Sequence, residues 1–168
     1  MQVHISASWK KDKTLKSVIP LKPPRIKVGF NMTILHFMEK IDVQSFRDTR
    51  GNLGVSELGI NPKFLTKRIY YINNVPKTVN RGVHGHKKLK QIVYALVGSF
   101  ELTVTDGVLT DKVTLSALSH GYFIPGGLWR ELNGFSDDAV CLILASDSFD
   151  ESDYIHDFEQ YKSWRAST

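Results

Sequence analysis

Two histidines separated by a single residue are the part of this sequence best suited to chemistry. They occur in the segment Arg81-Gly-Val-His84-Gly-His86-Lys87. Residues i and i+2 of a β-strand face the same side, so His84 and His86 would project together into one cavity. An unperturbed imidazole titrates near pH ~6.5, which suits such a pair to proton transfer or to metal ligation. The pattern alone also fits a solvated pair on an exposed strand.

Short apolar runs separated by turn residues predict an antiparallel β domain that begins near residue 38. The expected strands cover residues 68–72, 91–97, 99–105, 108–115, 121–124 and 139–145. Asp106-Gly107 is the strongest hairpin signal in the chain. Near the end, apolar residues recur every three positions, at Ile155, Phe158, Tyr161 and Trp164, which predicts a short amphipathic helix.

The spacing around the histidines resembles the two sequence motifs of the cupin superfamily. The first motif is a His-x-His pair, an acidic residue and a glycine, here matched by His84, His86, Gln91 and Gly98. The second is a glycine, a Pro-x-Gly turn, a histidine and an asparagine, here matched by residues 121–133. The resemblance implies an all-β fold, a cupin-like double-stranded β-helix (jelly-roll) barrel with a short C-terminal helix.

Two departures from the cupin pattern argue against a metal site. Metal-binding cupins use the acid of the first motif and the histidine of the second as ligands, and Gln91 and Arg130 replace them here. An amide oxygen is a poor substitute for a carboxylate, and a guanidinium has no lone pair to donate. The sequence therefore predicts a pocket that retains its histidine pair but holds no metal.

Composition restricts the class of protein. The chain has 168 residues, 42% hydrophobic and 23% charged, which fits one folded domain and excludes wholesale disorder. A single cysteine, Cys141, lies in an apolar run and cannot form an internal disulfide. No apolar stretch approaches the roughly 20 residues needed to span a bilayer. A cytoplasmic protein without a membrane partner is expected.

The net charge of +5 belongs to one end of the chain. Residues 1–27 carry a balance of +6, so the rest of the chain has a balance of −1. We therefore divide the chain into a basic, poorly ordered N-terminal extension, residues 1–37, and a domain, residues 38–168. Only the extension argues for nucleic-acid binding, and a solvated tail is the favoured interpretation.

Arginines near turns and strand ends indicate an anionic ligand for the domain. Guanidinium groups recognise phosphates through paired hydrogen bonds, and the candidates are Arg50, Arg68, Arg81 and Arg130. Four aromatic side chains could stack on a base or sugar, although most such residues belong to a core: Tyr70, Tyr71, Tyr122 and Trp129.

The resemblance narrows to the bacterial sugar 3,4-ketoisomerases, metal-free cupins that act on dTDP-4-dehydro-6-deoxyglucose. The motifs that carry it extend from about residue 39 to residue 158 and include Asp48-x-Arg50-Gly51, Lys67-Arg-Ile-Tyr-Tyr-Ile72, the histidine segment and Asp150-Glu-Ser-Asp-Tyr-Ile155. Residues 1–37 have no counterpart in the family. The resemblance also implies a homodimer, with the segment 42–57 supplying an edge strand to the partner.

The resemblance implies a mechanism by proton transfer without any cofactor. His86 is expected to remove the C3 proton, His84 to move protons between O3 and O4, and Tyr70 to bind the sugar or His84. The expected substrate contacts are Arg50, Arg68, Arg81, Lys87, Gln91, Trp129 and Arg130. Among them, Arg130 would stabilise the enediolate, and Arg50 and Arg130 are candidates for setting the product configuration at C4.

Three other functions stay open. A non-catalytic cupin that binds a sugar nucleotide would show ligand binding without proton exchange. A dTDP-sugar epimerase would act at C3 and C5, commonly with a histidine paired to an aspartate. A metal-dependent dioxygenase is disfavoured by Gln91 and Arg130.

Overall fold

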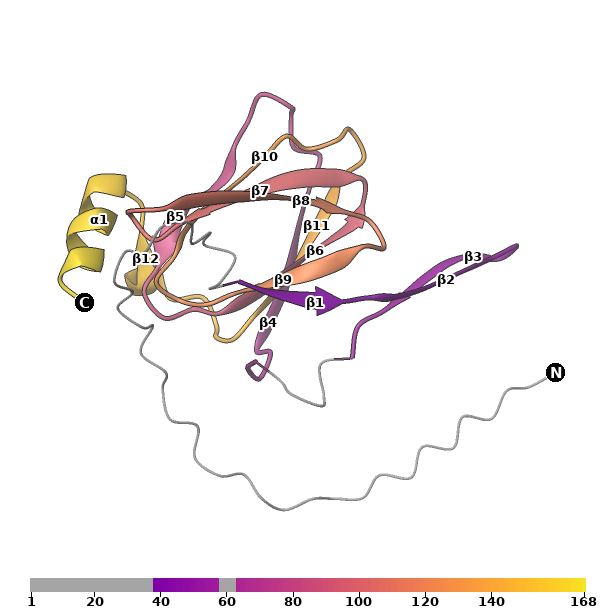
Figure 1. Cartoon of the computed structure of the whole chain (residues 1–168), viewed down its shortest axis with the longest axis horizontal. Helices are drawn as coiled ribbons and strands as arrows, with labels where there is room; N and C mark the ends of the chain where they lie inside the picture. Colours follow the sequence, from indigo (N-terminus) through magenta and orange to yellow (C-terminus); the bar gives the residue numbers. More distant parts are fainter. Residues whose placement is uncertain (1–37, 58–62) are drawn as a thin grey trace, which may run out of the picture. The chain divides into compact units, whose positions relative to one another are not determined.

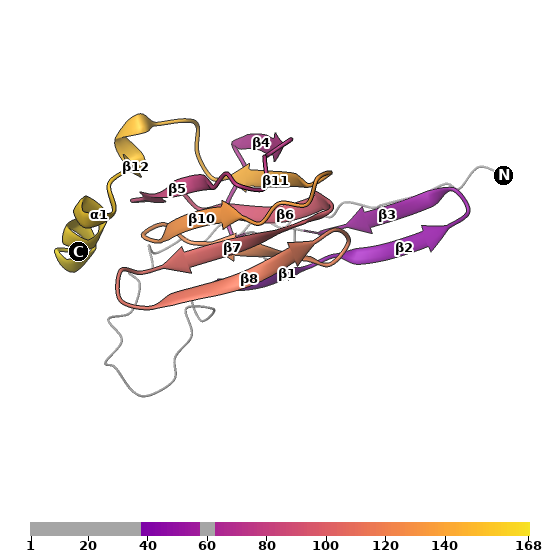
Figure 2. The same ribbon diagram turned by 90° about the horizontal axis from the view of Figure 1, so that it is seen from above.

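The computed structural model describes residues 38–57 and 63–168, so the predicted extension 1–37 lies outside the described residues. Two five-stranded sheets face each other (Figures 1 and 2). The first has the order β1 (Glu39–Asp42), β9 (His120–Ile124), β6 (Gln91–Val97), β11 (Val140–Ala145) and β4 (Arg68–Asn73). The second has the order β12 (Tyr154–Ile155), β5 (Arg81–His86), β10 (Trp129–Asn133), β7 (Ser99–Thr105) and β8 (Thr110–Ser116). Neighbouring strands within both sheets are antiparallel.

A hairpin, a 3₁₀ turn and a helix lie outside these two sheets. Strands β2 (Gln44–Asp48) and β3 (Gly51–Val55) form a hairpin that extends away from the sandwich (Figure 2). A short 3₁₀ turn, η2 (Glu151–Asp153), precedes β12, and helix α1 (Phe158–Ala166) ends the chain. None of the helices in the described part of the chain is both long and apolar enough to cross a membrane.

The structure confirms the predicted all-β architecture with one short C-terminal helix. Strands β6 and β7 have the predicted limits, and Asp106-Gly107 turns the chain between β7 and β8. The predicted helix was placed too early at Ile155, which pairs with Gly85 in β12. The helix begins only after Asp157, whose side chain accepts a hydrogen bond from the backbone N–H of Gln160 and caps the first turn.

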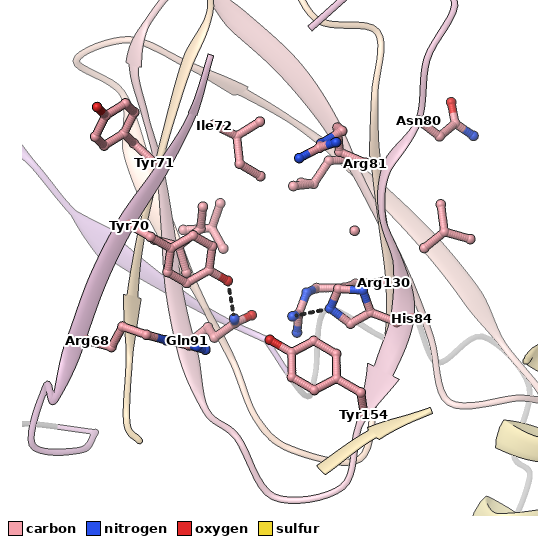
Figure 3. A pocket seen from close by; sticks show the side chains of 15 residues that line it. Arg68, Tyr70, Tyr71, Ile72, Asn80, Arg81, His84, Gln91, Arg130 and Tyr154 are labelled. Carbon is pink, nitrogen blue, oxygen red and sulfur yellow. Dashed lines mark hydrogen bonds between the residues drawn. The ribbon is translucent and has the colours of Figure 1, made fainter. Parts of the chain in front are cut away.

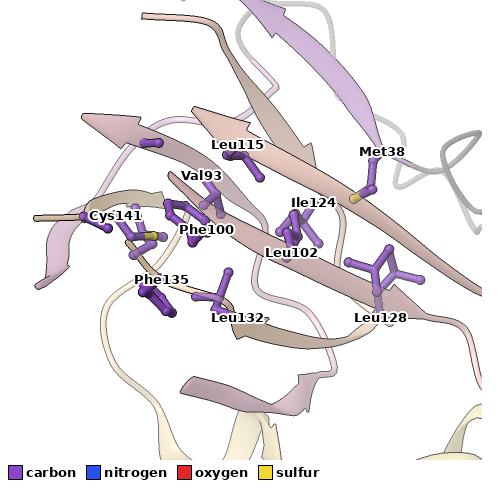
Figure 4. Close-up of a cluster of buried hydrophobic side chains, with 14 residues drawn as sticks. Met38, Val93, Phe100, Leu102, Leu115, Ile124, Leu128, Leu132, Phe135 and Cys141 are labelled. Carbon is purple, nitrogen blue, oxygen red and sulfur yellow. The ribbon is translucent and has the colours of Figure 1, made fainter. Parts of the chain in front are cut away.

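The hydrophobic core lies between the two sheets and forms part of the cavity wall described below (Figure 4). Alternate residues of β7, namely Phe100, Leu102 and Val104, point inward and are at most 1% exposed. Burying each such side chain contributes about 1.5–3 kcal/mol. Three core side chains from three different strands, Val93, Leu132 and Ile143, also line the cavity. The packing that stabilises the fold therefore shapes the site.

Helix α1 packs against the strand that carries the histidines. Tyr161 is fully buried, and its hydroxyl lies 2.8 Å from the carbonyl oxygen of Thr105 and 3.0 Å from that of Gly127, to which it donates. A Cβ atom at Gly85 would lie only 2.8 Å from the Tyr161 ring. The glycine between the two histidines is therefore needed for close packing on one face of β5, while both imidazoles point to the other.

Candidate active site

A cavity of about 520 Å³ opens between the two sheets, beside the histidine strand (Figure 3). Its polar lining residues are Arg68, Tyr70, Tyr71, Asn80, Arg81, His84, Gln91, Arg130 and Tyr154. Within the described part of the chain, three arginines and no acidic side chain line this cavity. Such a wall favours an anionic ligand.

His84 lies on the cavity wall and is bonded to a buried arginine. Pairing of β5 with β10 places Arg130 opposite His84, and Arg130 Nη2 lies 2.9 Å from His84 Nε2. A guanidinium stays protonated in proteins and can only donate, so His84 Nε2 accepts and carries no proton. Burial, and then the charge of Arg130, lowers the pKa of His84 to about 3. His84 is therefore neutral at physiological pH.

His86 lies beside His84 but is more deeply buried. The two rings meet edge to face with centroids 4.9 Å apart. The His86 side chain is 1% exposed and does not line the cavity, and its Nδ1 lies 2.9 Å from the Asp153 carboxylate. Burial, followed by the charges of Arg130 and His84, lowers the pKa of His86. Both histidines are thus neutral in the free protein.

Tyr70 and Gln91 form a hydrogen-bonded pair on the same cavity wall. Gln91 is 1% exposed, and its Nε2 donates to the Tyr70 hydroxyl at 2.7 Å. Because the hydroxyl oxygen accepts this bond, its own proton is free to point toward a ligand. Burial raises the pKa of Tyr70, so the phenol stays protonated. Gln91, in the position of a cupin metal ligand, therefore orients a tyrosine.

Tyr154 is a site residue that the sequence analysis missed. Its ring packs 4.9 Å from the His84 ring and 4.2 Å from the His86 ring, and it lines the cavity. Tyr154 pairs with His86 across β12 and β5, two segments far apart in sequence. In the sequence, Tyr154 was noted only as part of the motif Asp150–Ile155. That motif supported the family resemblance but did not assign a role to any of its residues.

Three predicted substrate contacts do not reach this cavity. Trp129 is buried with its ring 5.0 Å from Phe158, because alternation along β10 directs it to the face opposite Arg130. Lys87 donates to the carbonyl oxygen of Ser152, and Arg50 is exposed at the tip of the β2–β3 hairpin, paired with Asp48. The structure therefore gives Trp129 a packing role in place of the predicted ligand contact. The other predicted residues, Arg68, Tyr70, Arg81, His84, Gln91 and Arg130, surround one cavity.

The donor set does not resemble a metal centre. Across residues 38–57 and 63–168, no group of three or more His, Cys, Asp or Glu side chains is placed to hold a metal ion. Arg130 occupies the place of the second-motif histidine and donates toward His84, which puts positive charge where a cation would bind.

The chain matches a known family over most of its length. The family model described as WxcM-like, C-terminal (FdtA) matches residues 36–166. A curated TDP-4-oxo-6-deoxy-alpha-D-glucose-3,4-oxoisomerase from Aneurinibacillus thermoaerophilus is 36% identical over 126 residues, which are 75% of this chain and 91% of the relative.

Solved structures of similar sequence have the same fold. A 3,4-ketoisomerase from Helicobacter canadensis is 35% identical, with a TM-score of 0.71 over 77% of this chain and 97% of the other. A histidine-to-asparagine variant of the 3,4-ketoisomerase QdtA from Thermoanaerobacterium thermosaccharolyticum was solved with TDP-4-keto-6-deoxyglucose. It is 33% identical, with a TM-score of 0.73 over 79% of this chain and 96% of the other.

Proposed function

Because the chain belongs to the WxcM-like, C-terminal family, we propose that it is a sugar 3,4-ketoisomerase. It moves the keto group of a dTDP-4-dehydro-6-deoxyhexose from C4 to C3, in the biosynthesis of a deoxysugar. The observation that carries this proposal is a neutral histidine, a protonated tyrosine and a buried arginine on one cavity wall: His84, Tyr70 and Arg130.

The first proton transfer takes place at carbon. The C4 carbonyl acidifies the C3 hydrogen, and His84 removes it to form an enediolate. Arg130, whose guanidinium adjoins His84, stabilises the negative charge that develops on oxygen. His84 then returns the proton to C4. The Nε2 electron pair of His84 becomes available for this step when the Arg130 guanidinium turns from His84 Nε2 to the C4 carbonyl oxygen of the bound sugar.

The second proton transfer takes place between oxygens. The substrate O3 hydroxyl must lose a proton and O4 must gain one, so the reaction consumes and releases no proton overall. Tyr70 donates its hydroxyl proton to O4 and receives the O3 proton, and Gln91 holds the phenol in place. The reaction changes no net oxidation state, so its chemistry needs no redox cofactor.

This assignment revises the expected roles of the two histidines. A base that removes a proton from carbon must contact the substrate, and general bases act within about 2.6–3.2 Å of the group they deprotonate. His84 lines the cavity, whereas His86 lies behind it and is 1% exposed. We therefore assign the carbon base to His84 in place of His86.

The nucleotide is recognised by charge. Arg68 and Arg81 line the cavity on opposite sides of the gap between β4 and β5 (Figure 3). Neither is paired with an acidic side chain among the described salt bridges. Free guanidinium groups in this position suit the two phosphates of a dTDP-sugar.

The test of this function is proton NMR of dTDP-4-dehydro-6-deoxyglucose incubated with the protein in D₂O, with EDTA present. We expect a 3-keto product with deuterium at C4, because the base that returns the proton exchanges with solvent. An unchanged spectrum together with saturable binding would favour the binding protein. Deuterium at C5 would favour an epimerase, for which the His86–Asp153 pair is the specific supporting feature.

We further propose that the protein is a homodimer in which the β2–β3 hairpin packs on a second copy. Phe46 and Leu53 are cross-strand partners on this hairpin and are 55% and 57% exposed. Residues 38–57 and 63–168 add no third strand to this hairpin. An exposed apolar pair on such a hairpin is a favourable contact for another chain. The same packing would bring Arg50, at the hairpin tip, to the partner's site.

The oligomeric state is measurable by light scattering. We expect about twice the 19.0 kDa mass of one chain, and a smaller mass for the double variant Phe46→Ser/Leu53→Ser. A wild-type mass equal to one chain would contradict the proposal. Val108→Ser, which alters an 80% exposed apolar side chain away from the hairpin, is the matched control and should leave the mass unchanged.

A further inference from the structure

Asp153 makes more hydrogen bonds than a turn residue requires. Its Oδ1 accepts from the backbone N–H of Lys88 at 2.7 Å, and its Oδ2 accepts from that of Leu89 at 3.2 Å. The same Oδ2 lies 2.9 Å from His86 Nδ1. The carboxylate thus joins the turn after β5 to one imidazole, and its side chain is only 12% exposed.

These bonds determine which nitrogen of His86 carries the proton. A carboxylate can only accept, so Nδ1 must donate and the proton of the neutral ring lies there. Nε2 then has a lone pair, and within the described part of the chain this buried atom has no hydrogen-bond partner. His86 Nε2 is therefore a buried acceptor on a ring that packs against the rings of His84 and Tyr154.

The charges around the cluster disfavour a second proton on His86. The groups that face it are Arg130, His84, Arg68 and His156, together with Tyr154 and the Asp153 carboxylate. Two of these are permanent cations, and burial removes the water that would solvate an imidazolium. His86 therefore remains neutral.

We propose that Asp153 is a positioning residue that holds His86 in the Nδ1-protonated tautomer. The Nε2 lone pair of His86 then faces the cluster that contains His84 and stabilises the His84 imidazolium formed when the C3 proton is removed. With the opposite tautomer, an N–H would occupy this position and would disfavour a cation on His84. This inference rests on the proposed function. It adds that Asp153, through the tautomer of His86, stabilises the positive charge that His84 gains when it acts as the base.

The informative variant is Asp153→Asn. Its amide oxygen can still accept from the Lys88 N–H, and its NH₂ group then faces His86 Nδ1 and forces the proton onto Nε2. The Leu89 N–H loses its 3.2 Å acceptor in this variant. We expect kcat to fall about 10–100-fold, the range known for replacing the carboxylate partner of a metal-ligating histidine, with KM within about twofold. The acid limb of the kcat–pH profile should also move to lower pH, because the His84 imidazolium loses a stabilising acceptor.

Asp150→Asn is the matched control. Asp150 caps the same short turn through Ser152 but does not contact His86. We expect this variant to have the kcat and pH profile of the wild type. A loss of activity in both variants with no change in either pH profile would mean that the turn matters only as structure, which would overturn the proposal.

The tautomer itself is measured by ¹⁵N NMR of the full chain labelled at histidine. In the wild type we expect the pyrrole-type resonance of His86 at Nδ1 and the pyridine-type resonance at Nε2, with the two exchanged in Asp153→Asn. The wild-type spectrum needs no variant, so it decides the tautomer even if Asp153→Asn does not fold. A proton on Nε2 in the wild type, or an exchanged tautomer with wild-type kcat, would overturn the inference. Absence of isomerisation by the wild type would instead refute the proposed function, and the spectrum would still confirm or refute the tautomer.

Discussion

Replacing His84 with asparagine should lower kcat by about 10²–10⁴-fold, the usual contribution of a positioned acid–base group. The amide keeps a polar group near Arg130 but cannot take up the C3 proton. The affinity for the sugar nucleotide should stay within several-fold, because we propose that the phosphates bind Arg68 and Arg81, which line the cavity apart from His84. Single-turnover kinetics in D₂O, with binding measured by calorimetry, would separate these two effects.

The matched control for this experiment is His156→Asn. The His156 ring lies 5.9 Å from the His84 ring, but it is exposed and does not line the cavity. We expect nearly wild-type turnover from this variant. If instead His84→Asn keeps at least a tenth of the activity and His86→Asn loses it, the carbon base is His86 and the assignment made here is wrong.

Replacing Arg130 with methionine should lower kcat by about 10²–10³-fold, as expected for loss of one group that stabilises an oxyanion. A second effect concerns pH. The charge of Arg130 is the second cause, after burial, of the low pKa of His84, about 3. Without it the pKa should rise part of the way toward its ordinary value. Since the base must be unprotonated, the acid limb of kcat/KM should move to higher pH.

Both effects can be read from one set of pH profiles. For the wild type we expect kcat/KM to change little as pH falls from about 8 to about 5, whereas an unperturbed histidine would lose activity near pH ~6.5. Arg81→Met is the control, because Arg81 lines the cavity but is exposed and is not bonded to His84. It should raise KM without moving the acid limb. An unchanged profile in Arg130→Met would contradict the proposed coupling, provided that thermal unfolding shows a folded protein.

The long apolar strands could be predicted from sequence because their burial leaves a direct pattern. Strand β6 is a continuous apolar run and β7 alternates strictly, and both had the predicted limits. Strand β12 has only two residues, too few for a periodic pattern to appear, and β10 was not predicted as a strand although it is as long as β9. Their positions depend on pairing with β5 and β7, which is a property of the folded sheet.

Site residues that are brought in by strand pairing could not be predicted from the sequence, whereas those in a known motif could. His84, Gln91 and Arg130 were recognised because they occupy the positions of a known motif. Asp153 and Tyr154 come from a segment more than 60 residues away, so only the fold places them beside the histidines. Trp129 was predicted to stack on the ligand from its aromatic character and from the family resemblance, whereas alternation along β10 directs it to the face opposite Arg130.

The contact between Gly85 and Tyr161 makes the end of the chain part of the site. Any side chain at position 85 would displace the Tyr161 ring, and any loosening of α1 would remove the support behind β5. The geometry of the two imidazoles thus depends on residues that contact no ligand. A library that randomises position 85 and selects for turnover should therefore return glycine. A tag fused after Thr168 would lie close to helix α1, which supports the strand that carries the two histidines.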